Sequence, residues 1–396
     1  MTPPRLPPPL ALPQVDVPLR TIASQWGRIG CLGFGGPPTH IAMLRNVCVT
    51  KQRWLSEPDF EDAVVACNLL PGPASTQLAI YCALRIRGRV GAVVGGLAFI
   101  VPGLLLVLVL SSLFLSTAPP AAVAGAGAGA GAAVGAVALH AAISLIPASW
   151  ARASNHTRSG WILYLAAGAI AGATVGQYMV IILLLCGFTE LVRRSSVQMF
   201  SSHGFMFALP ATIDTAGAIE ATRRWGALAW TAFKVGGLAY GGGFVIVPLM
   251  RADAVDHHHW MTSTQFLNAV VLGQITPGPV THTVAAVGFA AAGLRGALLA
   301  AGFAFTPSFI FILVGGRRFD RLRANRHAQT FMLGAGPAAI GAILGSAVPL
   351  TTSLTEPWQY AIVPAASLAL VVKRVPIHIT LLCAAAIGTA ITLASG

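Results

Sequence analysis

Long runs of sequence without a charged residue decide what this chain can fold into. Residues 90–115, 118–150 and 160–189 contain no Asp, Glu, Lys or Arg. A helix needs about 20 apolar residues to cross the hydrocarbon core of a bilayer, so each run is long enough to span it. The runs do not alternate apolar with polar residues, which excludes barrel strands. The sequence therefore predicts an all-α polytopic membrane protein with roughly 10 to 14 membrane segments.

The few charged residues are mostly basic. Only 9% of the residues are charged, and the formal net charge is +13. Lys and Arg in the cytoplasmic loops of a membrane protein account for such an excess. The basic residues are scattered among apolar segments, which argues against a nucleic-acid-binding domain. We therefore expect the lipid bilayer to be the partner of this chain. Residues 1–20 are expected to form a disordered Pro-rich tail without a signal peptide.

The chain contains two copies of one unit. When the sequence is shifted by 206 residues, residues 28–77 lie over residues 234–283 without a gap, and 14 of the 50 aligned positions are identical. The identities include a glycine pair, a tryptophan and the tripeptide Pro-Gly-Pro, which occurs at 71–73 and again at 277–279. Such self-similarity indicates a structural repeat. We predict a first transporter repeat at 21–192, a cytoplasmic linker at 193–227 and a second repeat at 228–396.

The distribution of basic residues predicts that the two repeats have opposite orientations. The loop after the first Pro-Gly-Pro holds Arg85, Arg87 and Arg89, whereas its counterpart keeps only Arg295. One apolar span later the bias reverses, because residues 116–121 carry no charge and residues 316–329 carry five arginines. Positive charge marks the cytoplasmic side. Equivalent loops are therefore predicted on opposite sides, which makes the repeats inverted.

Each half has two predicted helix breaks. One is a glycine cluster, at residues 33–38 and 241–243, and the other is the Pro-Gly-Pro tripeptide. Proline removes a backbone donor and glycine permits unusual dihedral angles, so a helix is not expected to run through the tripeptide. The apolar stretches beside it are too short to span, which predicts re-entrant hairpins or broken helices. A simple kink with no ligand role is the alternative.

A helix that starts after such a break presents backbone N–H groups and a partial positive charge, which suit an oxyanion. Hydroxyl and amide side chains flank both breaks, and a basic residue precedes each glycine cluster. The candidate substrate-binding residues are Arg28, Gly35, Gly36, Asn68, Gly72, Ser75, Thr76, Gln77, Lys234, Gly242, Gly243, Gln274, Thr276, Gly278, Thr281 and His282.

A second group consists of candidate entrance or proton-coupling residues: His40, Arg45, Glu61, Asp62 and Arg251. The competing interpretation of the histidines, including His282, is an ordinary hydrogen-bonded side chain. The competing interpretation of the arginines is anchoring at the membrane interface. Snorkelling toward an interface competes with a substrate role for Arg28 and Lys234.

No catalytic, metal or cofactor motif is present in the sequence. It contains no GxSxG, no HExxH and no Walker A motif, and the six cysteines form no CxxC. The three consecutive histidines at 257–259 are interpreted as part of an outside loop and not as a metal site. The sequence therefore indicates a carrier and not an enzyme, with an ion gradient or the membrane potential as its source of energy.

These paired motifs resemble the chromate ion transporter family in its long, two-domain form. The residues that carry the resemblance are 33–37, 53–55, 68–77 and Pro102 in the first half, and 240–244, 248–249, 269–279 and Pro307 in the second. The resemblance implies efflux of chromate from a bacterial-type cell through its inner membrane, driven by the proton motive force or membrane potential. Sulfate or another small anion, a passive anion channel and a homodimeric assembly stay open.

Overall fold

The computed structural model describes residues 17–70, 72–116, 118–153, 158–174, 179–195, 218–239, 244–315 and 325–395. These residues form helices and connecting turns, without a strand among them, so the predicted all-α class is confirmed. The helices are α1 (Leu19–Leu32), α2 (Pro37–Arg45), the π-helix η1 (Asn46–Lys51), α3 (Glu57–Leu69), α4 (Ala74–Phe114), α5 (Ala121–Ala132), α6 (Val134–Ala151), α7 (Arg158–Thr174), α8 (Met179–Ser195), α9 (Ala218–Leu238), α10 (Ile246–Arg251), the π-helix η4 (Ala252–His257), α11 (Ser263–Ile275), the 3-10 helix η5 (Val280–His282), α12 (Thr283–Gly315), α14 (Arg326–Thr352), α15 (Pro357–Ser367), the π-helix η7 (Leu368–Val372) and α16 (Ile377–Ser395).

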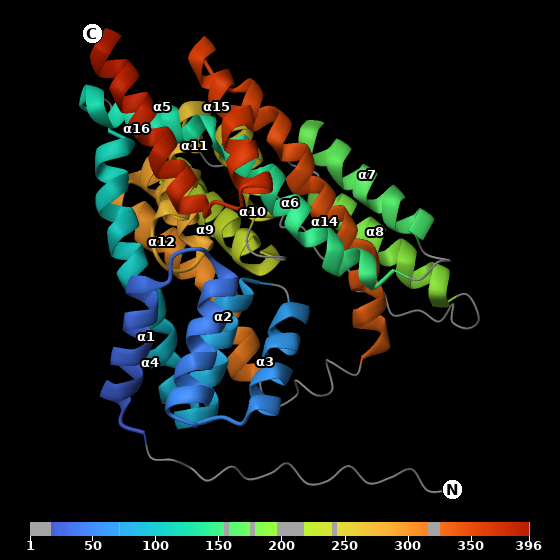
Figure 1. The fold of residues 1–396 in the computed structure, drawn as a ribbon. Coiled ribbons are helices and arrows are strands. Elements are labelled where there is room, and N and C mark those ends of the chain that lie inside the picture. The colour runs from blue at the N-terminus through green and yellow to red at the C-terminus, as the bar shows by residue number, and fades with distance from the viewer. Residues whose placement is uncertain are drawn as a thin grey trace, which may run out of the picture.

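Within the described ranges, five helical segments are long and apolar enough to cross a membrane. They are Ala74–Phe114, Ala121–Ala151, Val280–Gly315, Gln329–Thr352 and Ile377–Ser395. A shorter apolar helical segment, Pro357–Val372, includes α15, which lies beside these helices in Figure 1. The predicted tail and linker lie mostly outside the described residues, since α8 ends at Ser195 and α9 begins at Ala218.

Helices α4 and α12 each turn back on themselves. The backbone leaves helical geometry at Arg87 and Gly88 in α4, where Gly88 has φ +66°, and at the equivalent Ala292 and Gly293 in α12. A Cβ on Gly95 would lie 2.6 Å from that of Ala83. Residues twelve apart on a straight helix would be separated by about 18 Å. Each element is therefore two antiparallel arms, a short one followed by a long one.

The short arm of α4 pairs with α3 to form a re-entrant hairpin. Arg85, at the far end of the short arm, lies 4.0 Å from Asp59 at the start of α3, so both ends of the hairpin are on one side. In the second half, α11 and α12 meet in the same way, because Gly273 lies against Thr283. The tips hold Gly72 and Gly278, both with positive φ. Between the two predicted forms, the structure therefore has re-entrant hairpins.

The repeat is visible as matched elements. A π-helix follows Arg45 and another follows Arg251, and the hairpins begin at the N-caps Ser56 and Thr262. Figure 1 shows α2 and α3 toward the lower end of the molecule and α10 and α11 toward the upper part. Opposite placement of equivalent hairpins is the arrangement expected of inverted repeats. The inverted orientation itself stays a prediction.

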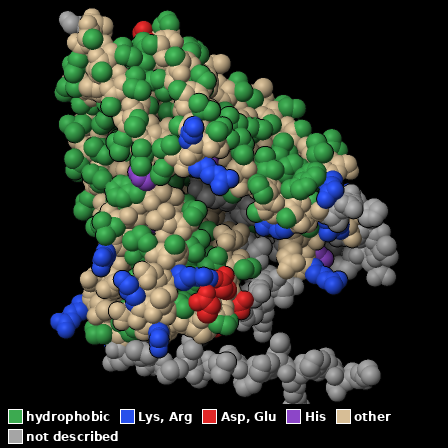
Figure 2. Space-filling view, in the orientation of Figure 1, with side chains coloured by type: hydrophobic (Ala, Val, Ile, Leu, Met, Phe, Trp, Pro, Cys, Tyr) green, Lys and Arg blue, Asp and Glu red, His purple; other side chains and the backbone are tan. Residues whose placement is uncertain are grey.

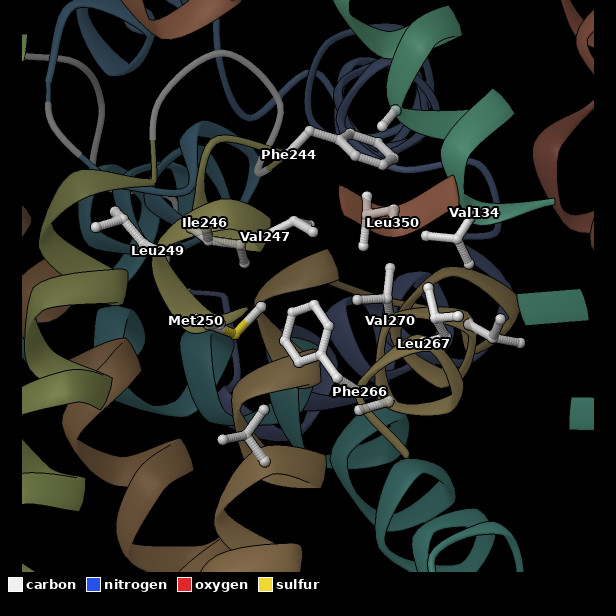
Figure 3. Close-up of a cluster of buried hydrophobic side chains, with 14 of the residues drawn as sticks. Val134, Phe244, Ile246, Val247, Leu249, Met250, Phe266, Leu267, Val270 and Leu350 are labelled. Carbon is white, nitrogen blue, oxygen red and sulfur yellow. The ribbon is translucent and has the colours of Figure 1, made fainter. Parts of the chain in front are cut away.

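The second-half hairpin is buried in the largest apolar cluster. Ile246, Val247, Leu249 and Met250 of α10 are buried, as are the side chains of α11 that they pack against (Figure 3). Close packing of this kind makes the position of a side chain sensitive to single methyl groups. The cluster therefore holds the tip of the hairpin in a fixed place.

Helices α7 and α14 pack closely through glycines. Four glycines lie where the two helices touch: Gly168, Gly172, Gly341 and Gly345. A Cβ at Gly341 would meet the carbonyl oxygen of Leu165. Small residues spaced four apart allow this approach between membrane helices, where packing replaces the hydrophobic effect as the attractive force.

We therefore expect Gly341→Val to lower the melting temperature of the detergent-purified protein, by an overpacking cost of about 1–3 kcal/mol. Gly302→Val is the matched control, because Gly302 is an exposed residue of α12 with no neighbour within 4 Å of an added Cβ. Both substitutions carry the same change in helix propensity. Equal melting temperatures for the two variants would show that the α7–α14 contact tolerates a side chain.

Candidate functional site

A cavity of about 410 Å³ lies between the two halves of the chain. A water molecule takes up about 30 Å³ of liquid, so the cavity has room for a small oxyanion and several waters. Six of the predicted substrate-binding residues line it: Gly35, Gly36, Asn68, Gln274, Thr276 and Gly278. Residues 200 positions apart in the sequence are thus brought to one place by the two hairpins.

The first half contributes a turn and an amide to this cavity. Gly35 and Gly36 have φ of +101° and +75°, which lets the chain leave α1 and begin α2 beside the cavity. Pro37 and Pro38 occupy the first turn of α2 and have no N–H, so this helix end offers its dipole rather than hydrogen-bond donors. Asn68 stands on the last turn of α3, just before the tip of its hairpin.

The second half contributes the repeat equivalent of Asn68, which is Gln274. Its side chain is 8% exposed, and its Nε2 has no hydrogen-bond partner among the described residues. A buried amide donor without a partner costs free energy unless a ligand or water satisfies it. Thr276 donates its hydroxyl hydrogen to the carbonyl of Leu272, which leaves its oxygen able to accept. Val280, at the start of η5, also lines the cavity.

The tip of each hairpin packs against the first helix of the other half. The N–H of Gly278 donates to the carbonyl of Gly33 at 3.1 Å, and a Cβ on Gly278 would lie 3.8 Å from the carbonyl of Gly30. In the reciprocal contact, a Cβ on Gly72 would lie 3.4 Å from the carbonyl of Gly236, the repeat equivalent of Gly30. The two halves are therefore joined at the site by their tips.

The hydroxyl-rich residues after each tip are buried behind the cavity. Ser75, Thr76 and Gln77 are at most 2% exposed, as are Thr281 and His282. The hydroxyls of Thr76 and Thr281 have no hydrogen-bond partner in the described structure. Gln77 approaches Gly72, so it braces its own tip. These residues do not line the cavity. Their positions allow them to support the residues that do.

The two buried histidines have different surroundings. His40 accepts or donates through Nε2 at 2.8 Å from the carbonyl of Gly33, the same carbonyl that binds Gly278. His282 lies near the backbone of Ile100, but neither ring nitrogen reaches hydrogen-bond geometry, and its ring packs edge-on against Phe305 at 5.4 Å. His40 is thus hydrogen-bonded to the backbone, and both interpretations of its role stay predictions.

The predicted basic residues do not enter the cavity. Arg28 has an exposed side chain on α1. Arg45 forms ion pairs with Glu57, at 3.0 Å, and with Glu61, and Arg251 pairs with Asp256 at 3.0 Å. Figure 2 shows a cluster of acidic side chains beside Lys and Arg at the lower end of the face, with further Lys and Arg in its middle and along its right side.

Asp62 is an exposed residue of α3, and its side chain is not without an interaction partner. Gly242 and Gly243 lie outside the described residues.

Lys234 is bound to a carboxylate inside the second half. Its Nζ lies 2.6 Å from Asp253, whose carboxylate also accepts a hydrogen bond from Thr231 at 2.9 Å. The two ionic side chains are 17% and 11% exposed. Removing one member of a buried ion pair leaves the other charge uncompensated, which is strongly destabilising.

We therefore expect Lys234→Met to lower the melting temperature and the amount of protein in the membrane. The double variant Lys234→Met/Asp253→Leu should recover both, because no charge is left unpaired. Thermal unfolding of the purified variants measures the effect. If Lys234→Met had the melting temperature of the unsubstituted protein and lost only transport, Lys234 would act by binding the anion and not by stabilising Asp253.

Sequence reasoning missed the contribution of α6. His140 and Ser144, one helical turn apart, line the 410 Å³ cavity from this helix. A neighbouring cavity of about 250 Å³ shares Asn68 and Leu145 with it and is also lined by Arg152. α6 lies outside the aligned repeat, so the comparison of the two halves could not identify its residues as part of the site. The available signal was that His140 is the one titratable residue in the charge-free run 118–150.

The described residues contain no group of three metal-ligating side chains. Of the three consecutive histidines, His257 and His258 contact one another through their Nδ1 atoms at 3.3 Å, and His259 contacts the carbonyl of Val255 at 2.7 Å.

Comparison with known proteins covers nearly the whole chain. A family model described as chromate transporter matches residues 20–191 and 226–389. A chromate transport protein of Cupriavidus metallidurans is 29% identical over 363 residues, which are 90% of this chain and 88% of that protein. A chromate transport protein of Pseudomonas aeruginosa is 29% identical over 89% of this chain and 84% of its own length.

A probable chromate transport protein of Synechococcus elongatus is 29% identical over 84% of both chains. No solved structure matches.

Proposed function

This chain belongs to the chromate transporter family, and from that premise we propose that it exports chromate across the membrane as a secondary active transporter. Its bacterial relatives and its several apolar helices identify it as a multi-pass protein of the bacterial inner membrane. Chromate transport is supported by membership of the family, and the efflux direction and the coupling to a gradient are the proposal.

The observation that carries the proposal is the 410 Å³ cavity between the two re-entrant hairpins. An oxyanion that leaves water must exchange its hydration shell for donors in the protein. The amides of Asn68 and Gln274 reach the cavity from equivalent positions of the two halves, and Gln274 has a donor without a partner. Hydrogen bonds to a charged group are stronger than those between neutral groups. We propose that these two amides hold the anion.

The neighbouring 250 Å³ cavity supports a route to this site. It shares Asn68 and Leu145 with the central cavity, and Arg152 at the end of α6 lines it. Basic residues in such a position raise the local concentration of anions. We place the route from the cytoplasm along Arg152 toward Asn68, because basic residues mark the cytoplasmic side.

Alternating access would follow from the paired hairpins. Inverted repeats with a site at their interface commonly work by movement of one repeat against the other around a fixed site. The reciprocal packing of each tip on the other half supports such an arrangement, since movement of one repeat changes the contacts of both tips. The sequence has no ATP-binding motif, so the proposal takes the proton motive force or the membrane potential as the source of energy.

Transport measurements in proteoliposomes test this function. Purified protein reconstituted with chromate on one side is expected to move it faster under an imposed pH or voltage gradient than without one. Competition with sulfate and molybdate decides whether the site selects chromate among tetrahedral dianions. Stronger transport of sulfate would reassign the substrate. Passive flux with single-channel conductance would indicate a channel and not a carrier. Chemical conversion of chromate by the purified protein would indicate an enzyme.

A further inference from the structure

One titratable side chain lines the central cavity within the described structure, and it is His140. The residue stands in the middle of α6, inside the candidate span Ala121–Ala151, and its side chain is half-buried. An ionisable residue within a membrane span is costly and is a functional candidate by default. Because His140 lines the cavity, its side chain would be next to a bound anion.

The rest of the cavity lining is electrically neutral. It consists of glycine, proline and apolar residues together with two amides and two hydroxyls, those of Asn68, Gln274, Ser144 and Thr276. Neutral donors alone compensate a dianion poorly once it has left water. The Nε2 of the buried Gln274 has no hydrogen-bond partner in the described structure, and an acceptor that reached it would satisfy this donor. A cationic donor on the same wall would complete such a site.

His140 and Ser144 share one face of α6, because residues four apart on a helix are neighbours. Ser144 donates its hydroxyl hydrogen to the carbonyl of Ala141 at 2.8 Å, so its oxygen accepts and its orientation is fixed. The adjacent residue Leu145 lines both cavities. His140 therefore stands on the wall of α6 that an anion meets after it passes Asn68 and Leu145.

Few other titratable groups lie on the elements that pack against α6. Helices α5 and α11 carry none, and α14 carries Arg326 and His327 in its first turn, far along the helix. Helix α7, which contacts the C-terminal end of α6, carries Arg158 and Tyr164. On the side of η7 and α15, the groups are Lys373 at the end of η7, Arg374 after it, Tyr360 within α15 and Glu356 at its N-cap.

His378 follows Ile377, which lines the cavity, but its own ring contacts Phe34. No ion pair of His140 is found within the described part of the chain.

We propose that His140 binds the transported oxyanion as an imidazolium and supplies the full positive charge of the site. This inference rests on the proposed function. Bound anion favours the protonated ring, and the protonated ring favours the anion, because the two equilibria are linked. The apparent affinity for a dianion therefore falls as the pH rises through the pKa of the ring.

The test measures initial rates of oxyanion transport in proteoliposomes between pH 5.5 and 8.5 for His140→Gln, His140→Lys and the unsubstituted protein. His140→Gln is expected to raise the apparent KM about 10- to 100-fold at acidic pH and to flatten its dependence on pH. His140→Lys keeps a charge over the whole range, so it should retain affinity and also flatten the profile. Chromate itself takes up a proton near neutral pH, and a profile caused by the substrate alone would persist in both variants.

His327→Gln is the matched control, because His327 is exposed at the start of α14 and lines neither cavity. Its profile should match that of the unsubstituted protein. A second readout uses no variant: saturating chromate should slow the carbethoxylation of His140 by diethyl pyrocarbonate, followed by mass spectrometry.

Unchanged profiles in both His140 variants, or modification of His140 at the same rate with chromate, would overturn the inference. If the unsubstituted protein moved no oxyanion at any pH, the proposed function would fail instead. The two failures are thus distinct.

Discussion

Replacing Gly278 with alanine is expected to abolish oxyanion transport while the protein still reaches the membrane. Gly278 has φ +93°, a conformation that costs a residue with a Cβ about 1–2 kcal/mol. The new Cβ would also lie 3.1 Å from Cε1 of His282, closer than ordinary contact. The tip would shift, and with it the hydrogen bond from Gly278 to the carbonyl of Gly33 that joins the halves. Transport rates per amount of protein measure the loss.

Two glycines of α12 provide controls for Gly278→Ala. Gly293 also has positive φ, +61°, but a Cβ there meets nothing within 4 Å and the residue lines neither cavity. Gly293→Ala should therefore reproduce the backbone strain and reduce stability without stopping transport. Gly302→Ala, in ordinary helix, should do neither. Normal transport by Gly278→Ala would show that the tip is not part of the site.

Removing both cavity amides should have the second large effect. Each hydrogen bond to a charged group contributes about 1.5–3 kcal/mol, which corresponds to about 10- to 100-fold in affinity. Asn68→Ala and Gln274→Ala are therefore each expected to raise the apparent KM for chromate by that factor. If the two residues bind one anion, as proposed, the effect of the double variant should differ from the product of the two single effects, whereas independent sites would give that product.

Asn268→Ala is the control for the amide variants. Asn268 is a buried amide on α11, 9% exposed, with an Oδ1 that has no partner in the described part of the chain, and it lines neither cavity. Its loss should change stability and leave the apparent KM unaltered. An unchanged KM in Asn68→Ala and Gln274→Ala would place the anion outside the 410 Å³ cavity.

The repeat made much of the fold predictable. A tripeptide such as Pro-Gly-Pro breaks a helix wherever it occurs, so its two copies located both hairpin tips without knowledge of the packing. The amides Asn68 and Gln274 were found for the same reason, since they occupy equivalent positions just before each tip. Local chemistry decides these features, and local chemistry is readable in a sequence.

The surroundings of the charged candidates could not be predicted in the same way. Arg28 and Lys234 occupy equivalent positions, yet Arg28 is exposed and Lys234 pairs with Asp253. The difference arises because the first half has Val47 at the position of Asp253, and this pairing joins residues on different helices. The rotation of a helix about its axis depends on all its neighbours, so the repeat alignment could not show where either side chain points. His140 was missed because α6 has no aligned counterpart.

The carbonyl of Gly33 has a further consequence for how the protein is made. It binds both His40, a few residues away, and Gly278 in the other half, while the tip at Gly72 rests against Gly236. During synthesis the first repeat leaves the ribosome long before Gly236 and Gly278 exist. Its tip and its glycine turn must wait in the membrane with these contacts unmade. Completion of the site is therefore a late step of biogenesis, and two separately expressed halves would have the surfaces to find one another.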